Sequence, residues 1–538
     1  MILSIDQNSH PLWDAAAKVQ ALVRAGREVR HLVEDVDTAF TRVGGQAGDP
    51  LGLRRETYHH SGGADWGAAL FYSLFLGRQP LNVRSLEPYL GMKLSALARQ
   101  AGSSVESLYE QFSPGDNWQL VGPSYAGDAR YHRVIGDLGV GETAPFLREI
   151  LSLARRDTLE RFCARDAQER TADWFDRQQA MLEELLAAHE GGTLVDLYRD
   201  WMTRCCAEAE VALASSLGDT SAPPAGAELL ELFLRDYDRA AALYNESIAE
   251  AADYLRPLRI DEGELPMFAI VERDGRPRRA GMSLDGGRLR VGEREFPLPG
   301  DRGLPLDALR EGGVRCVLGK AVLLVIQVRL GPGGCPLALP LHGSVYVPAA
   351  HALTRKLAAA RLLDPPSCPI LRVRLRLLDR LGELDTPIRL PDYLSEATNR
   401  DEVSSRELAR SWRDWTIQAA GRLEMFRDPA GRQVWQRQAC RDLLDQIDRL
   451  DARRRDLARV DPKSNEVREL SHRSRTLQGQ LLDRTFRQVV RDWQVCQLDY
   501  WDSRGAILPW AHAAGGEPFV KHVLDQAEIN EEWDSIVN

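Results

Sequence analysis

The order of the predicted elements after residue 266 constrains the fold of this chain more than any single motif. A meander with alternating polar and apolar side chains, residues 267–299, precedes two apolar segments, 321–329 and 370–378, which we predict as strands. Between these segments lie a further strand, a short loop (341–344) and a helix. Strands that alternate with helices are typical of α/β domains with a parallel sheet. The second half of the chain therefore predicts an α/β core.

The region that precedes the C-terminal segment has the periodicity of paired helices. Apolar residues recur at helical spacing over 443–457 and again over 467–496. Asp461 and Pro462 lie between the two runs, and they predict the N-cap and the first residue of the second helix. This pattern predicts an antiparallel coiled-coil hairpin with its tip near 461–465. Such a hairpin favours a homodimer surface or a lever.

The N-terminal half is predicted to be mainly helical, over residues 11–43, 142–162, 170–189, 193–215 and 227–254, with a short strand at 118–121. We therefore expect an α/β protein with a Rossmann-like core, helical insertions and a C-terminal antiparallel coiled-coil hairpin. The expected units are an N-terminal helical segment (1–56), the core (57–400) with its helical region (142–254) and β-meander (266–299), the hairpin (401–503), and a segment that packs back on the core (504–538).

Composition argues against several classes of protein. A chain of 538 residues that is 44% hydrophobic and 28% charged is expected to be globular, with two or three domains. Its net charge of −10 argues against nucleic-acid binding, and residues 94–112, which have a helix-turn-helix rhythm, carry Glu106 and Glu110 where a recognition helix needs basic residues. We find no apolar run of about 18 residues and no signal peptide, so we expect a cytoplasmic protein without a membrane span. Eight irregularly spaced Cys residues fit a reducing compartment and predict no metal site.

Three loops of the predicted core are candidate ligand sites, and the first contains His60, Ser61, Gly62 and Gly63. Two glycines in front of a helix expose backbone N–H groups, and the helix dipole favours an anion at that end. Ser61 adds a hydroxyl donor, and the histidine adds a cation or a proton relay. The alternative is a tight turn that only connects two elements.

The second loop contains Tyr125 and Asp128, with His132 four residues after the aspartate. A carboxylate and an imidazole are the groups that general acid–base catalysis requires. The two side chains share a face only if the backbone there is helical.

The third loop, with Gly343, Ser344 and Tyr346, follows a buried strand and precedes a helix. A Gly-Ser pair at a strand end suits an anionic or carbonyl ligand. Lys320, which we predict at the start of the neighbouring strand, is a candidate for the same ligand. Ordinary turn chemistry explains these residues equally well.

From about residue 227 onward, the order of elements resembles the bacillithiol biosynthesis cysteine-adding enzyme family. That family has a helical lead-in, a meander that ends in an exposed arginine, a glycine-containing loop before an aromatic helix, a Pro-Pro segment with a strand carrying Arg, and a long coiled coil. The corresponding segments here are 268–276, 338–346 and 365–372. The N-terminal half is similar more loosely, through 61–63, 118–128 and 211–219.

The resemblance implies a ligase that joins cysteine, or a similar small amine or thiol compound, to a sugar-linked acceptor such as glucosaminyl malate. It also implies ATP, although no Gly-x-x-x-x-Gly-Lys-Ser/Thr loop is present. Asp128 and His132 would then transfer protons, and the first and third loops with Lys320 would hold substrate. The family's Gln-Gln pair is replaced here, and Tyr346 stands where the family has Glu. The alternative is a non-catalytic interaction or regulatory protein that keeps the fold and binds a partner through its coiled coil.

Overall fold

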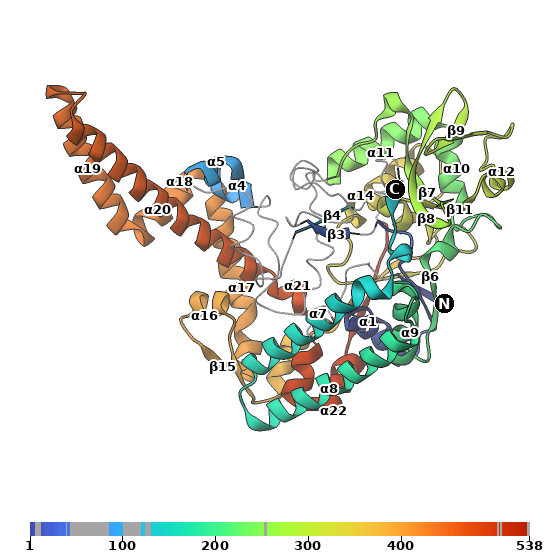
Figure 1. The fold of residues 1–538 in the computed structure, drawn as a ribbon, viewed down its shortest axis with the longest axis horizontal. Coiled ribbons are helices and arrows are strands. Elements are labelled where there is room, and N and C mark those ends of the chain that lie inside the picture. Colours follow the sequence, from blue (N-terminus) through green and yellow to red (C-terminus); the bar gives the residue numbers. More distant parts are fainter. Residues whose placement is uncertain are drawn as a thin grey trace.

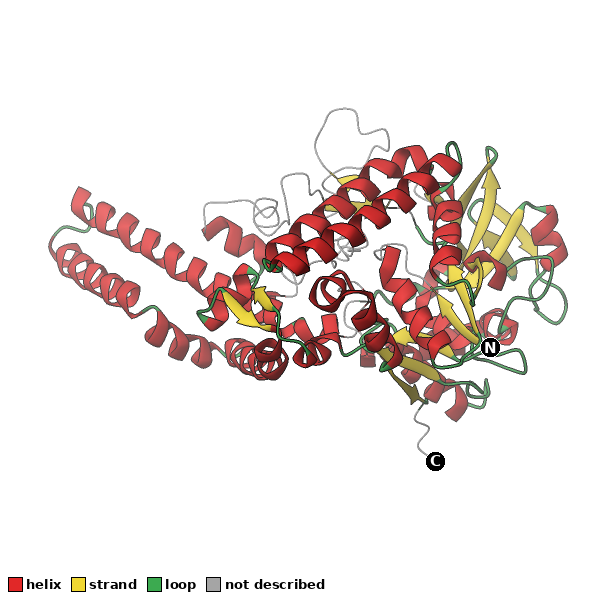
Figure 2. Cartoon of the chain, turned by 90° about the horizontal axis from the view of Figure 1, so that it is seen from below, coloured by secondary structure: helices red, strands yellow, loops and turns green. Residues whose placement is uncertain are grey.

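The computed structural model describes residues 1–5, 12–38, 40–43, 86–100, 120–123, 131–251, 255–502, 505 and 508–534. Figure 1 shows a body that holds two β-sheets with their helices, and a long arm of two helices that leaves this body. The arm also stands apart from the body in the perpendicular view of Figure 2. One of the sheets consists mainly of parallel strands interleaved with helices, which confirms the predicted α/β class.

The parallel sheet has six strands in the order β16-β13-β12-β1-β2-β6. These strands are β1 (Ile2–Ile5), β2 (Val29–Val33), β6 (Glu210–Leu213), β12 (Leu337–Pro340), β13 (Ile370–Arg374) and β16 (Glu528–Glu532). Five of them run parallel, and β16 pairs antiparallel with β13. The chain fills the sheet outward from β1 through β2 to β6, and then adds β12 and β13 on the other side of β1. The direction of filling therefore reverses between β1 and β12.

Alternate residues of these strands enter two different cores, because side chains of a strand point to opposite faces. Ala338 and Leu371 belong to one core, with residues of α1 (Leu12–Arg24), α9 (Leu194–Cys205) and α22 (Leu508–Asp525). Leu337 and Ile370 belong to the other core, with residues of α10 (Ala227–Arg235), α11 (Tyr237–Ala251), α13 (Ala321–Gln327) and α14 (Val347–Ala359). Burial on both faces explains why β12 is apolar without alternation.

The second sheet is antiparallel, and its strand order is β10-β9-β8-β7-β11, with β5 paired to β8. Its strands are β5 (Tyr131–Arg133), β7 (Glu264–Arg273), β8 (Arg276–Asp285), β9 (Arg288–Val291), β10 (Arg294–Pro297) and β11 (Val314–Gly319). Asp274 and Gly275 turn between β7 and β8 with φ of 53° and 71°, which is the left-handed backbone that a two-residue hairpin turn requires. The predicted meander is confirmed.

The predicted strand over 321–329 is wrong, because these residues form α13. A short apolar run that is buried on all sides has no period that separates a strand from a helix. The helix buries Val322, Leu323 and Ile326 in a core with α10, α11 and α14, and the Gln327 side chain accepts a hydrogen bond from the Gly319 backbone N–H (3.1 Å). The strand of this region is β11, which ends just before Lys320.

Two predicted N-terminal helices are also shorter than expected. The helix predicted over 11–43 ends at Arg24, because Gly26 with φ of 73° turns the chain into β2. The helix predicted over 193–215 ends at Cys205 and is followed by β6. In its described part, the segment 1–56 therefore contributes strands as well as a helix. The other predicted helices are confirmed as α7 (Val140–Arg161), α8 (Arg165–Ala188), α10 and α11.

The arm consists of α19 (Arg441–Val460) and the distal part of α20 (Asn465–Cys496), which pack side by side. The turn lies where it was predicted, but its cap differs from the prediction. Ser464 Oγ accepts a hydrogen bond from the Val467 N–H (3.3 Å) and so caps α20. Asp461 instead accepts from the Lys463 N–H inside the turn (3.1 Å), which leaves it too far from the helix to cap it.

The base of the arm is fixed to α17 (Ser405–Arg427) and α4 (Glu87–Leu90) by a small apolar core that includes Phe426, Phe486 and Val489.

The other α-helices and strands of the described residues are short. They are β3 (Phe40–Val43), α5 (Leu94–Gln100), β4 (Leu120–Pro123), α12 (Leu306–Glu311), α15 (Leu377–Arg380), β14 (Pro387–Arg389), α16 (Asp392–Thr398), β15 (Glu402–Ser404), α18 (Pro429–Ala439) and α21 (Leu498–Asp502). None of the helices within the described ranges combines the length and the apolar character that a membrane span needs.

Candidate active site

The carboxyl edge of the six-stranded sheet, beside the reversal between β1 and β12, is the candidate active site. In open α/β sheets, ligands bind outside the carboxyl ends of the strands at the point where the strand order reverses. Here β1 ends at Ile5 and β12 ends at Pro340, and these two strands are parallel neighbours. The residues that follow each strand therefore decide the chemistry of this edge.

A tight turn follows β12 and fixes the position of the third predicted loop. The Gly343 N–H donates to the Pro340 carbonyl at 2.8 Å, and a Cβ atom at Gly343 would lie only 2.6 Å from Pro340 Cδ. Ser344 has the left-handed φ of 63°. This turn leaves the His342 side chain 42% exposed at the edge.

His342 forms a hydrogen bond with Asp499, which lies on α21. The His342 Nε2 and Asp499 Oδ2 atoms are 2.6 Å apart, and Arg374 at the end of β13 donates to Asp499 Oδ1 at 3.2 Å. The hydrogen bond from His342 lowers the pKa of the Asp499 carboxyl against the effect of burial, and electrostatic interactions with His342 and Arg374 lower it further. An accessible imidazole that is oriented by an ionised carboxylate is the arrangement of a general acid or base.

Arg372 holds the same turn from the neighbouring strand. Its guanidinium donates to the Gly343 carbonyl at 2.6 Å and also contacts the Glu532 carboxylate. Glu532 is 2.8 Å from His351 Nε2, and Asp534 is 2.5 Å from His351 Nδ1. The turn after β12 is thus connected to the C-terminal strand by alternating charges.

Carboxyl groups gather on the other side of the reversal, after β2. Asp35 Oδ1 accepts from the Ser215 N–H at 2.8 Å, and Glu34 Oε1 accepts from the backbone N–H groups of Val36 (3.1 Å) and Asp37 (3.0 Å). Burial raises the pKa of Glu34 to about 8, and the neighbouring charges of Asp37 and Asp35 act in the same direction. Burial also raises the pKa of Asp35.

Arg279 on β8 lies within electrostatic range of two predicted site residues, His132 and Lys320. It lies opposite His132 in the pairing of β5 with β8, and its Nη1 is 2.5 Å from Asp37 Oδ1. Burial lowers the pKa of His132, and the charge of Arg279 lowers it further. Lys320, at the start of α13, pairs with Glu264 at 3.1 Å. Burial lowers the pKa of Lys320, Glu264 opposes this, and Arg279 adds a smaller lowering effect.

Tyr346 connects this group with the turn after β12. It is the N-cap residue of α14, and its side chain packs partly buried against the core. Burial raises the pKa of the Tyr244 hydroxyl, and the charges of both Glu264 and Tyr346 contribute to the increase. Tyr244 therefore lies within electrostatic range of the partner of Lys320 and of the third loop.

The predicted site residues thus have different outcomes. Gly343, Ser344 and Tyr346 lie in and beside the turn after β12, and His132 and Lys320 lie around Arg279. The loops with His60, Ser61, Gly62, Gly63, Tyr125 and Asp128 lie outside the described residues.

Three residues of this edge, Asp499, Arg372 and Arg374, are not among the predicted site residues. The two arginines alternate with apolar residues at the end of an apolar strand, which is a usable signal for side chains at the carboxyl edge. No local pattern marks Asp499, because its contact with His342 joins residues that are far apart in the chain.

A buried cation lies at the end of β1. Lys18 on α1 is 8% exposed, and its Nζ donates to the carbonyl of Ile5 at 3.3 Å. Beneath it, Ser4 Oγ and His31 Nδ1 lie 3.1 Å apart on neighbouring strands. Burial lowers the pKa of His31 to about 3, and the charge of Lys18 acts in the same direction, so this imidazole is neutral. Lys18 is a suitable group for a phosphate at the reversal point.

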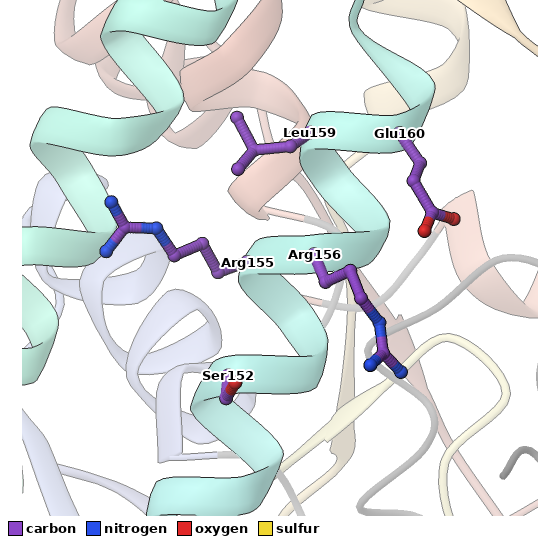
Figure 3. A pocket seen from close by; sticks show the side chains of 5 residues that line it. All are labelled: Ser152, Arg155, Arg156, Leu159 and Glu160. Carbon is purple, nitrogen blue, oxygen red and sulfur yellow. The ribbon is translucent and has the colours of Figure 1, made fainter.

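A separate hollow lies along α7 and contains none of these groups. Figure 3 shows its lining, Ser152, Arg155, Arg156, Leu159 and Glu160, all of which come from this one helix. Arg155 is engaged by Asp176 at 2.5 Å. Within the described ranges, no group of three or more His, Cys, Asp or Glu side chains is arranged to hold a metal ion.

Comparison with protein-family models, with curated proteins and with solved structures gave no match.

Proposed function

We propose that the protein is a carbon–nitrogen ligase that joins cysteine, or a similar small amine or thiol compound, to a sugar-linked acceptor. The observation that carries this proposal is the division of charge along the carboxyl edge of the sheet. Carboxyl groups of Glu34 and Asp35 follow β2, and Arg372 and Arg374 on β13 carry guanidinium groups that Glu532, Asp499 and Asp502 engage. An amine-bearing reactant suits the first side, and a carboxylate-bearing reactant would compete with these carboxylates for the arginines on the second, so the two would meet over β1 and β12.

The raised pKa of Glu34 supports the amine side of this proposal. Burial, and after it the neighbouring carboxyl groups, favour the protonated form of Glu34, and a bound ammonium group would restore its ionised form. At the same time, an amine must lose its proton before it attacks a carboxyl carbon. His342 is the proposed base: its Nε2–H donates to Asp499, which leaves the Nδ1 lone pair for the proton of the amine.

The strand order supports a Rossmann-like core, and the α19–α20 pair supports a coiled-coil hairpin, as in the family that the sequence resembles. Formation of an amide needs an activated carboxylate, so ATP is the proposed co-substrate and Lys18 is the proposed contact for its phosphates. We place the reaction in the cytoplasm, where such small thiol compounds are made.

Mass spectrometry of a reaction with ATP, cysteine and glucosaminyl malate tests the proposal. The wild type should give a product of the combined mass minus water, and His342→Gln should lower the rate at least a hundredfold, because a base contributes about 10²–10⁴. His522→Gln is the matched control, since His522 pairs with Glu383 at 2.8 Å and is similarly exposed (43%). Absence of the product from the wild type would reject the ligase. Equal losses in both variants would reject the role of His342.

The arm favours a second candidate, an interaction protein that binds a partner or a second copy through its helices. The arm leaves the body in both views, and Val460 at its tip is 86% exposed. A projecting helix pair offers its sides to a partner helix, as in coiled-coil assemblies. Under this alternative, removal of the arm abolishes partner binding, whereas under the first proposal the chemistry of the sheet edge survives.

A further inference from the structure

Two cysteines lie side by side at the opposite, amino edge of the six-stranded sheet. Cys335 lies just before β12 and Cys368 just before β13, and these parallel strands pair with Leu337 opposite Ile370. Cys335 lies two residues before Leu337, and Cys368 lies two residues before Ile370. If the register of the two strands is extended back by two residues, the cysteines lie opposite each other on the same face of the sheet. Both side chains are partly exposed.

Contacts of the two sulfur atoms support this proximity. Cys368 Sγ lies 3.4 Å from the Gly334 carbonyl oxygen, which belongs to the peptide bond that leads into Cys335. Cys335 Sγ lies 3.8 Å from the preceding carbonyl, that of Gly333. Both thiols thus contact consecutive peptide groups of one turn. Cysteines whose Cα atoms are separated by about one strand spacing are within the range that a disulfide bridges.

The other cysteines lack this combination. Cys206, Cys316 and Cys440 are buried, and burial raises the pKa of the Cys205 and Cys496 thiols to about 11. Cys163, just before α8, is exposed. The next cysteine along the chain is Cys205, so Cys163 has no neighbouring cysteine in the sequence. Only thiolates attack disulfides, so buried thiols react slowly.

We propose that Cys335 and Cys368 form a reversible thiol–disulfide site. The oxidant is a low-molecular-weight disulfide, R–S–S–R. The thiolate of one cysteine attacks a sulfur of this disulfide, forms a mixed disulfide and releases one R–SH. The second thiolate attacks the protein sulfur of that mixed disulfide and releases the other R–SH. Both cysteine sulfurs are oxidised, and the small disulfide is reduced to two thiols that carry away the two protons.

The disulfide between Cys335 and Cys368 would lie beside the contacts of Arg329 that hold the C-terminal strand β16 in place. The carbonyl of Cys368 accepts from Arg329 Nη1 at 3.3 Å, and the same Arg329 nitrogen donates to Asp534, two residues after β16, at 2.7 Å. A disulfide at this point ties the amino ends of β12 and β13 together beside that contact.

Treatment of the full-length protein with glutathione disulfide, followed by alkylation and peptide mass spectrometry without reduction, tests the site. We expect a cross-link between the tryptic peptides 330–355 and 362–372 that dithiothreitol removes. Cys335→Ser and Cys368→Ser should each lose the cross-link and carry glutathione on the remaining cysteine, whereas Cys163→Ser should keep it.

Two outcomes would overturn the proposal. The first is a wild type in which Cys163 carries glutathione and the peptides of Cys335 and Cys368 remain unlinked. The second is a wild type in which both cysteines keep separate glutathione adducts, because the second step then fails. This test does not depend on the ligase activity, so either proposal can fail alone.

Discussion

His351 shows how single residues hold the C-terminal strand against the sheet. Its two ring nitrogens face Asp534 and Glu532, and the fully buried Arg329 donates to Asp534. A buried guanidinium group without a partner costs several kcal/mol, so Asp534 is needed to compensate it. The same series of charges continues through Glu532 and Arg372 to the turn after β12.

The protonation of His351 predicts a pH dependence of stability. Burial alone would lower the pKa of His351, but the hydrogen bonds to Asp534 and Glu532 outweigh it and raise the pKa to about 9. The folded state therefore binds this proton more tightly than the unfolded state, whose pKa is near 6.5. The stabilisation is complete below about pH 6.5 and is lost as the pH rises through about 9.

Urea unfolding of the wild type and of His351→Gln at pH 6 and at pH 9.5 measures this contribution. After an allowance for solvent screening, we expect the wild type to be more stable by about 2 kcal/mol at pH 6, with little difference at pH 9.5. Comparison with the variant cancels the groups that titrate in both proteins. A difference that grows toward pH 9.5 would contradict the raised pKa.

At the scale of elements, the arm depends on how its two helices begin and end. Ser464 caps α20, whereas Asp461 bonds only within the turn. The base of the arm is held by Arg422 on α17, whose Nε and Nη2 donate to the carboxylate of the fully buried Asp492 on α20 (3.0, 3.1 and 2.7 Å). Near the tip, Ser474 Oγ bonds to Asp451 Oδ1 at 3.0 Å and joins the two helices.

Ser464→Ala should destabilise the start of α20 by about 1 kcal/mol, since a capping hydroxyl is lost. Hydrogen exchange of the first turn of α20 should then become about fivefold faster, with no change at the base of the arm. Asp461→Ala is the control and should have a smaller effect on the same amides. A larger effect of Asp461→Ala than of Ser464→Ala would show that Asp461, and not Ser464, caps α20.

At the scale of the whole molecule, the two ends of the chain meet in one sheet. β1 and β2 come from the N-terminus, β16 comes from the C-terminus, and β12 and β13 join them. The arm is inserted between β13 and β16, yet it returns to the body after α20. An insertion of this kind can be shortened without a change to the strand order.

Removal of residues 443–483 tests the arm as a dimer surface. Arg484 Nη1 donates to Asp442 Oδ1 at 2.9 Å, so a short Gly-Ser linker can join these neighbours. In light scattering, the full chain should be a dimer and the shortened chain a monomer, with the far-UV spectrum of the body retained. The same oligomeric state in both proteins would reject this role of the arm.

Local features of the fold were predictable because short-range chemistry determines them. The Asp274-Gly275 turn needs left-handed backbone that these two residues tolerate, and the helical periodicity of α19 and α20 persists over several turns. The turn after β12 was also predictable, since Gly343 follows an apolar strand. The partners of this turn were not, because Asp499 and Arg372 reach it only after distant elements have packed.

By itself, the sequence determined the α/β class, the meander, the helix pair of the arm and one glycine turn at a strand end, since each depends on neighbours along the chain. Only the tertiary structure decided that 321–327 is a helix, that both chain ends enter one sheet, and that the carboxyl groups of Glu34 and Asp35 share an edge of this sheet with the ion-paired Arg372 and Arg374. Pairing between distant strands and burial of charges set these features, and neither leaves a periodic signal in the sequence.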